Sequence, residues 1–338
     1  MRERARIIRR VRAFFDTQDY LETDTPLLAP NLIPESCLEV FETLRLPPGG
    51  SRGEKKPYWL IPSPEIWMKR LIAVHRTNMY QICKCFRNGE SSGSQHNPEF
   101  TMLEYYTMDA DYLDSLRLTE KLFNFLLDPG QDNSSGKTLS ELSPPFIRLT
   151  VEEAFRRWAG FDLYDAARTP GAMEREARRL GLCQTSDMSD TTGLSIAQLY
   201  DLIFIHTVEP NLKDGKPVAL IDYPAFVPCL AKKSPGGKTV ERWELYARGI
   251  ELANCFTEET NPEEVRRFFE SEKAVKEKNA LVRHKVDDDY WKIFGPENSF
   301  PQRNLFPQCS GVAMGLDRLI MLLCGRKTLD GVLPFTME

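Results

Sequence analysis

Strand-like stretches in this chain follow one another through loops and turns, and they do not alternate regularly with helices. The stretches 79–86 and 98–108 are separated only by a polar loop, and two more meet at a tight turn within 241–259. Antiparallel strands can be joined by short turns, whereas parallel strands need a long crossover, usually a helix. This order therefore predicts an α+β fold in which helices flank an antiparallel β-sheet.

The helices are predicted from apolar residues that recur at helical spacing. The first helix ends before "ETDTPLLAP", where Pro26 and Pro30 favour extended chain. Its arginines are expected to form a solvated face or salt bridges at the edge of a dimer. Further helices are expected within the stretches 111–127, 150–159, 195–210, 261–282 and 309–325.

Length and composition limit the class of protein. The chain has 338 residues, of which 41% are hydrophobic and 28% charged, so it can form one large globular domain or two ordinary ones. No apolar run approaches the ~18 residues of a membrane-spanning helix, and the Arg-rich start lacks the apolar core of a secretory signal. We therefore expect a cytoplasmic protein without a membrane partner. The net charge of −5 gives no sign of nucleic-acid binding through bulk charge.

The stretch "ERWELYARGIELANCFTEE", residues 241–259, carries glutamates at intervals of seven. With Arg248 and Gly249 as the turn of a hairpin, Tyr246 lies opposite Glu251. Because side chains alternate along a strand, one face of this hairpin is predicted to hold Glu244, Tyr246, Glu251 and Ala253.

Glu244 and Glu251 are then diagonal neighbours on paired strands. Such residues lie about 7–8 Å apart, and two carboxylates that close repel each other unless a cation or a proton sits between them. A hard divalent ion suits the pair. The alternative for an isolated pair of strand glutamates is a solvated acidic face.

A second group of polar residues lies around the loop that joins 79–86 to 98–108. The first strand ends in Arg87, and the loop carries Glu90 and His96. The second strand presents three residues that share a face through their even spacing, Phe100, Glu104 and Tyr106. An aromatic plane can stack on a base, and a carboxylate with a phenol can hold a cation.

Near the C-terminus, small residues in "GVAMGLDRL" lead into Asp317 and Arg318 at the start of a helix. An arginine beside free backbone N–H groups suits phosphate. The alternative is that Arg318 forms only a structural ion pair with Asp317.

Taken together, these stretches resemble motifs 2 and 3 of class II aminoacyl-tRNA synthetases, and "TPLLAP" after the first helix resembles motif 1. "HNPEFTMLE" and "IELANCF" are similar to the lysyl branch in particular. The four stretches occur in the family's order over nearly the whole chain. The resemblance implies that the carboxylate of an amino acid attacks the α-phosphate of ATP to give an adenylate and pyrophosphate. No protein nucleophile is needed, because catalysis consists of alignment and charge stabilisation.

The resemblance also implies roles at the ATP site. Arg87 matches the arginine that bridges the substrate carboxylate and the α-phosphate, and Arg318 matches the one on the γ-phosphate. Phe100 matches the adenine platform, and Glu90 is expected on the adenine side. His96 is expected to contact ATP, with a loop spacer as the alternative.

For the metal and the amino acid, the resemblance implies Glu244 and Glu251 as Mg²⁺ ligands and Glu65 as the acceptor for the α-ammonium. The alternative for Glu65 is a simple pair with Lys69, one helical turn on. The residues assigned to the side-chain ammonium are Glu104, Tyr106 and Glu258. The remaining residues assigned to the substrate pocket are Asn254, Phe256 and Ala313.

The domain organisation is expected to be simple. Lysyl-tRNA synthetases carry an anticodon-reading OB domain before motif 1, whereas motif 1 begins at the start of this sequence. We therefore expect 1–338 to be one catalytic domain without an OB domain. The resemblance is closest to the shortened paralogues that attach (R)-β-lysine to elongation factor P, which have Ala where Ala313 stands. It implies activation of lysine or (R)-β-lysine, transfer to elongation factor P and not to tRNA, and a homodimer.

Three departures from the family pattern are visible. The motif 2 loop is one residue longer than usual, Gln95 replaces a common arginine, and Cys255 replaces a glycine and is expected to add a side chain beside the substrate pocket. Two alternative functions stay open at this point. One is a truncated lysyl-tRNA synthetase that acts on tRNA, and the other is a catalytically silent paralogue with a regulatory role.

Overall fold

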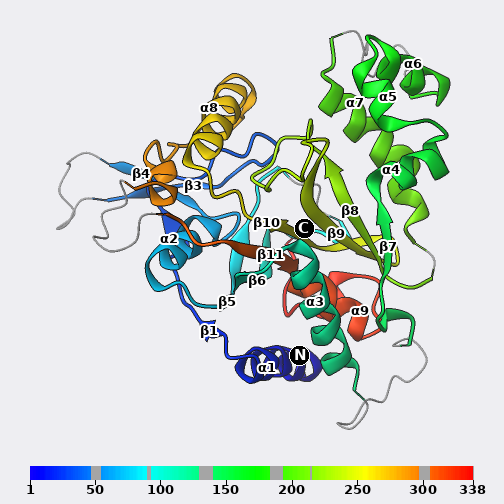
Figure 1. Ribbon diagram of the computed structural model, residues 1–338. Coiled ribbons are helices and arrows are strands. Elements are labelled where there is room, and N and C mark those ends of the chain that lie inside the picture. The colour runs from blue at the N-terminus through cyan, green and yellow to red at the C-terminus, as the bar shows by residue number, and fades with distance from the viewer. Residues whose placement is uncertain are drawn as a thin grey trace.

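The computed structural model describes most of the chain. The described ranges are 1–46, 55–89, 93–128, 140–182, 193–213, 215–296 and 305–337. Within them, the largest element is an eight-stranded sheet with the order β1-β5-β6-β11-β10-β9-β8-β7 (Figure 1). Its strands are β1 Leu21–Glu22, β5 Met79–Phe86, β6 Glu99–Met108, β7 Ile147–Thr150, β8 Val218–Pro224, β9 Thr239–Ala247, β10 Ile250–Thr257 and β11 Cys309–Gly315.

The pairing of these strands confirms the predicted fold class. The neighbours are antiparallel except at the two ends of the sheet, where β1 pairs with β5 and β7 pairs with β8 in parallel. The protein therefore has an α+β fold with a mostly antiparallel central sheet. None of the helices in the described ranges is both long and apolar enough to cross a bilayer.

One face of the sheet is apolar. Side chains alternate along a strand, and Leu103 and Tyr105 of β6 are fully buried in the same cluster as Trp243 and Leu245 of β9. The helices that cover this face are α1 Arg2–Thr17, α3 Tyr112–Leu127 and α9 Leu316–Leu323 (Figure 1). The residues between the apolar ones point to the opposite face, and on β6, β9 and β10 these include the predicted site residues.

Two groups of helices pack beside that opposite face. Near β5 and β6, a second buried cluster contains Ile66, Phe269 and Tyr290, which belong to α2 Glu65–His75, α8 Pro262–Asn279 and η6 Tyr290–Phe294. Near β8 and β9, a third cluster holds a group of helices and helical turns (Figure 1). These are α4 Val151–Ala154, η3 Phe155–Ala159, α5 Leu163–Arg168, α6 Ala172–Arg179, α7 Ile196–Ile203, η4 Phe204–Val208 and η5 Glu209–Asn211.

Local sequence explains where several helices begin. The Asp111 side chain accepts hydrogen bonds from the backbone N–H groups of Leu113 and Asp114, and the Asp114 carboxylate accepts one from the Asp111 backbone N–H, so these two residues form a capping box at the start of α3. Asn261 caps α8, and Pro262 occupies its first turn. The predicted helices 150–159 and 195–210 are present, but each begins as an α-helix and continues as a π-helix.

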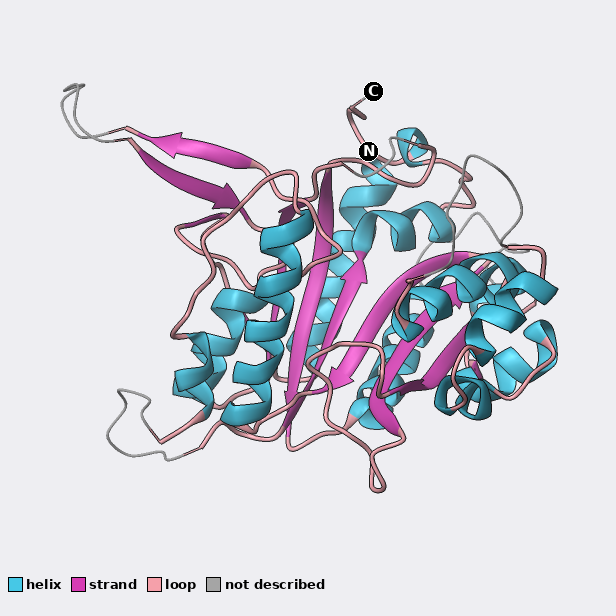
Figure 2. Ribbon diagram, turned by 90° about the horizontal axis from the view of Figure 1, so that it is seen from above, coloured by secondary structure: helices cyan, strands magenta, loops and turns pink. Residues whose placement is uncertain are grey.

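The smaller elements did not stand out in the sequence. A three-stranded sheet has the order β2-β4-β3, with β2 Leu28–Ala29, β3 Glu42–Arg45 and β4 Lys56–Leu60. Strands β3 and β4 project away from the main body (Figure 2). The short turns η2 Ser140–Leu142 and η7 Leu329–Gly331 complete the described elements. Such short segments carry too few residues for a periodic pattern to identify them.

The hairpin of β9 and β10 has the predicted turn. Arg248 and Gly249 both have positive φ, 54° and 74°, as two-residue hairpin turns require. Tyr246 lies opposite Glu251, as expected. Beyond this pair the register shifts between Glu251 and Ala253. A β-bulge, in which one strand carries an extra residue, produces this shift.

The bulge overturns two predictions. Ala253 does not share the face of Glu244; it lies opposite Leu245 and is 2% exposed in the apolar core. Cys255 is also in that core, with its Sγ 3.2 Å from the Ser310 Oγ, so it does not line the substrate pocket. In their place, the shift sets Asn254 opposite Glu244.

Candidate active site

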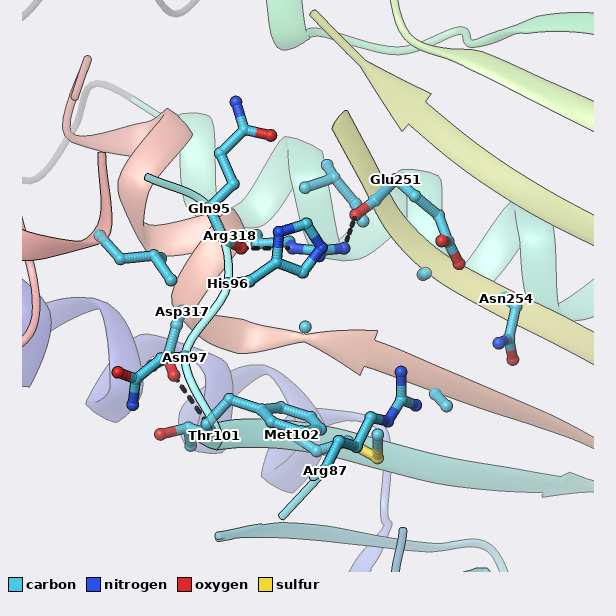
Figure 3. A pocket seen from close by; sticks show the side chains of 16 residues that line it. Arg87, Gln95, His96, Asn97, Thr101, Met102, Glu251, Asn254, Asp317 and Arg318 are labelled. Atoms are coloured by element: carbon cyan, nitrogen blue, oxygen red, sulfur yellow. Dashed lines mark hydrogen bonds between the residues drawn. The ribbon is translucent and has the colours of Figure 1, made fainter. Parts of the chain in front are cut away.

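A pocket opens on the polar face of the sheet, between β6, β10, β11 and the start of α9 (Figure 3). The predicted site residues that line it are Arg87, His96, Phe100, Glu251, Asn254, Ala313 and Arg318. They come from stretches that lie far apart in the sequence. The pocket therefore exists only because β6, β11 and β10 are neighbours in the sheet.

Arg87 and Phe100 form one wall of this pocket. Arg87 follows β5, and its backbone N–H donates to the Pro98 carbonyl just before β6. The Arg87 Cζ lies 5.2 Å from the centre of the Phe100 ring, a distance at which a guanidinium interacts with an aromatic face. In Figure 3 the Arg87 side chain points into the pocket. An anion and a planar ring can thus bind next to each other here.

Arg318 is held by backbone carbonyls on the other side of the pocket. Its Nη1 donates to the Glu251 carbonyl at 2.9 Å and its Nε to the Gln95 carbonyl at 3.2 Å (Figure 3). The expected alternative, a pair between Arg318 and Asp317, is wrong, because Asp317 pairs with Arg4 at 2.5 Å. Carbonyl contacts orient the guanidinium without neutralising it, so its charge is available to an anion.

Glu244 and Glu251 lie at the β9–β10 end of the site. Glu244 is only 8% exposed, so a solvated acidic face is excluded. It accepts a hydrogen bond from the Tyr246 hydroxyl at 2.7 Å and pairs with Arg242. Burial, and then repulsion by Glu244, raise the pKa of Glu251 to about 7, although Arg318 lowers it in part. The Glu251 carboxylate is therefore short of positive charge.

The donor set at this end suits Mg²⁺. Among the residues that the structure describes, no cluster of three or more His, Cys, Asp or Glu side chains could enclose a metal ion. Mg²⁺ commonly binds through one or two carboxylates and completes its shell with water and substrate phosphates. Glu244 and Glu251 fit that pattern, with nucleotide phosphates as the missing ligands.

A second cluster of carboxylates lies on the same face, farther along β6 and β10. Glu104 is 2% exposed and accepts hydrogen bonds from the Ser63 Oγ at 2.6 Å and the Tyr106 hydroxyl at 2.7 Å. Burial, and then repulsion by Glu65, raise the pKa of Glu104 to about 8. Glu258 is also 2% exposed. Three buried or half-buried carboxylates together require positive charge nearby.

Lys69 supplies part of that charge. Its ammonium lies 2.5 Å from the Glu65 Oε1 and 2.6 Å from the Glu258 Oε2, and its side chain is 1% exposed. The pair of Glu65 with Lys69, which was the alternative to an acceptor for the α-ammonium, is therefore present. The contact with Glu258 was not expected, because Glu258 follows β10 and lies far from α2 in the sequence.

Two of the remaining predicted residues, Ala313 and Phe256, lie in the described part of the chain. Ala313 lies in register with Asn254 on one side and Glu104 on the other. Phe256 is half-buried, and the Arg242 guanidinium lies 5.4 Å from its ring centre. Glu90 lies outside the described residues.

A family model described as tRNA synthetases class II (D, K and N) matches residues 1–338 of this chain. The chain belongs to this family. The letters stand for aspartate, lysine and asparagine. Class II synthetases are ligases that activate an amino acid with ATP and generally use Mg²⁺. The site has a part suited to each of these ligands. The pocket offers arginines, an aromatic ring and a carboxylate pair for ATP and Mg²⁺, and the second cluster offers carboxylates for the amino acid.

Arg4 connects the stretches that carry Phe100 and Arg318 in this class II family member. Its side chain is 10% exposed and that of Asp317 is 3% exposed. Arg4 donates to the Thr101 Oγ1 at 2.8 Å, and Asp317 accepts from the Thr101 backbone N–H at 2.7 Å. The prediction of a solvated arginine face is wrong for Arg4. The network fixes the residue after Phe100 and the residue before Arg318.

Arg4→Met is expected to raise the KM for ATP by about 10-fold and to lower stability by roughly 3–5 kcal/mol, because it leaves the buried Asp317 charge unpaired. The KM for the amino acid should change less than about twofold, since the carboxylate cluster is elsewhere. Pyrophosphate exchange and thermal unfolding measure these effects. Arg12→Met is the control, because Arg12 is 43% exposed on the same helix. A lower stability with an unchanged KM for ATP would show that Arg4 supports only the fold.

Proposed function

We propose that this protein activates lysine or (R)-β-lysine as an adenylate and transfers it to a lysine side chain of elongation factor P. The observation that carries the proposal is the carboxylate cluster of Glu65, Glu104 and Glu258 beside the pocket that holds Arg87 and Arg318. A diamino acid supplies the two ammonium groups that such a cluster can hold. Its carboxylate then lies toward the arginines.

The chain's own groups suffice to align the first reaction. The substrate carboxylate attacks the α-phosphorus of ATP, the bond to the β-phosphate oxygen breaks, and pyrophosphate leaves. Arg87 neutralises the carboxylate and the α-phosphate as they approach, and Arg318 binds the departing phosphates. Phe100 carries the adenine ring. Glu244 and Glu251 would hold Mg²⁺, which when bound stabilises negative charge on the phosphates.

The transfer step needs an acceptor amine. The free ε-amine of the acceptor attacks the adenylate carbonyl, an amide forms, AMP leaves, and the amine loses a proton. We propose elongation factor P as the acceptor and not tRNA. The grounds are the sequence resemblance and the alanine at position 313, Ala313. A homodimer is proposed on the basis of motif 1, and sedimentation at micromolar concentration should give twice the chain mass. A protein that sediments as a monomer under those conditions would contradict the proposed homodimer.

The test of function offers ATP with lysine, (R)-β-lysine or norleucine, and then elongation factor P or tRNA. Pyrophosphate exchange should require a distal ammonium, so norleucine should be inactive. Mass spectrometry should show one acyl group on elongation factor P and none on tRNA. Acylation of tRNA alone would favour a truncated synthetase, and no exchange with any amino acid would favour the silent paralogue.

Ala313→Gly is expected to raise kcat/KM for lysine relative to (R)-β-lysine. The methyl of Ala313 lies between Asn254 and Glu104 in the sheet register, so it occupies part of the wall beside the substrate amine. One methyl-sized contact is worth about 1–3 kcal/mol, so the ratio should move by roughly 10–200-fold. Exchange assays with both isomers measure it. If the ratio of the two kcat/KM values does not change, Ala313 does not discriminate between lysine and (R)-β-lysine.

A further inference from the structure

Lys69 occupies an unusual place for a lysine. Its buried ammonium bridges Glu65 at the start of α2 and Glu258, which directly follows β10. Lysine is almost never fully buried unless it is paired. Burial alone would lower its pKa, but Glu258 and Glu65 raise the pKa well above the usual value. Lys69 therefore stays charged at neutral pH.

The charges around Lys69 do not balance. Glu65, Glu104 and Glu258 provide three carboxyl groups, and Lys69 provides one ammonium. With all three carboxyl groups ionised, two negative charges are left over. Buried charges are costly unless they are paired. A ligand with two ammonium groups cancels this excess, whereas a ligand with one does not.

We propose that Lys69 is a specificity-determining residue, which keeps the Glu258 carboxylate ionised and fixed in place beside Glu65, so that the carboxylate cluster selects diamino acids. The inference rests on the proposed function, because it assumes that the amino acid binds at this cluster. Lys69 acts through the glutamates and does not itself need to contact the substrate.

The electrostatics of Glu258 support this role. Burial raises the pKa of Glu258 to about 7, and Lys69 is the strongest group that holds it down. Without the Lys69 ammonium, two neighbouring carboxyl groups would share a proton. A substrate ammonium would then have to displace that proton. The affinity for lysine would fall at neutral pH and recover only at higher pH.

Other titratable groups lie around Lys69 and its carboxylates. Glu35 is one of them, and burial and then Glu65 raise its pKa to about 7. Tyr106, Tyr290 and Cys309 have pKa values raised well above their usual ranges by burial, so they stay neutral near pH 7. Glu104 titrates at about 8, and Lys69 lowers its pKa as well. Removing Lys69 should therefore shift both Glu104 and Glu258 in the same direction.

The test compares the KM for lysine of the wild type, Lys69→Met and Lys69→Arg by pyrophosphate exchange from pH 6 to 9.5. Lys69→Met should raise this KM at least about 10-fold at pH 7, and the pH at which the KM recovers should move up by about one unit or more. The KM for ATP should stay within about twofold, and Lys69→Arg should keep the wild-type pH profile because it retains a cation. A uniform rise in KM with an unchanged pH profile overturns the inference.

A measurement without substrate separates this inference from the proposed function. A carboxyl group whose pKa is higher in the folded than in the unfolded state makes stability fall as pH rises between the two values. In Lys69→Met that fall should extend to higher pH than in the wild type and in Lys69→Arg, because Glu104 and Glu258 then both release their protons later. Adding Glu258→Gln to Lys69→Met should remove the part of this extended fall that comes from Glu258. A Lys69→Met profile that follows the wild type, or a double variant that does not fold, overturns the role of Lys69. Failure of the wild type to activate lysine would overturn only the proposed function.

Discussion

Glu251→Gln should abolish adenylate formation while the fold stays intact. Glutamine keeps the size of the side chain but removes one anionic ligand from a pair that is suited to Mg²⁺. Loss of metal stabilisation on the phosphates is worth several kcal/mol, so pyrophosphate exchange should fall by on the order of 100-fold or more. Stability should be unchanged or higher, because burial and Glu244 already disfavour the charge on Glu251.

The matched control for this variant is Glu241→Gln, which makes the same change on β9. Glu241 is an odd number of residues from Glu244, so it lies on the other face of the strand. It should exchange pyrophosphate at the wild-type rate. If Glu251→Gln also exchanges at that rate under limiting Mg²⁺, the metal assignment is incorrect.

Gly311→Ala should remove amino-acid binding. A Cβ at this position would lie 2.3 Å from the Glu258 Oε1 and 2.5 Å from a ring carbon of Tyr106. Both side chains are 2% exposed, and Lys69 holds the Glu258 carboxylate, so neither can move aside freely. Overpacking should cost about 1–3 kcal/mol of stability. Displacing two ammonium acceptors should raise the KM for lysine by at least about 100-fold.

Gly315→Ala is the matched control on the same strand. There the nearest atoms to the new methyl would be the Arg318 Cδ at 3.6 Å and the Leu252 carbonyl oxygen at 3.7 Å, which are ordinary contacts. Its KM for lysine should stay close to that of the wild type. A Gly311→Ala protein that binds lysine normally in calorimetry would show that the ammonium does not bind beside Glu258 and Tyr106.

Local sequence determined much of the fold of this protein. The strand over 79–86 ends where the prediction placed it, and the Arg248–Gly249 turn fixes the start of the β9–β10 hairpin. Both depend on interactions between residues that are close in the chain, such as side-chain alternation and positive φ at a turn. The same holds for the pair of Glu65 with Lys69, which lie four residues apart on a helix.

The tertiary structure decided which side chains reach the site. The bulge after Glu251 turns Cys255 into the core and sets Asn254 opposite Glu244. A bulge changes the face of every later residue, and the local spacing of apolar residues did not reveal it.

Long-range packing determined which of the remaining charged side chains contact each other. Arg4 reaches Asp317 from the other end of the chain, and Lys69 reaches Glu258 from a different element. The sequence shows that these charges exist, but not which of them meet. Burial decides that, because a charge removed from water must find a partner within reach, and only the packed sheet and helices determine which partner is near.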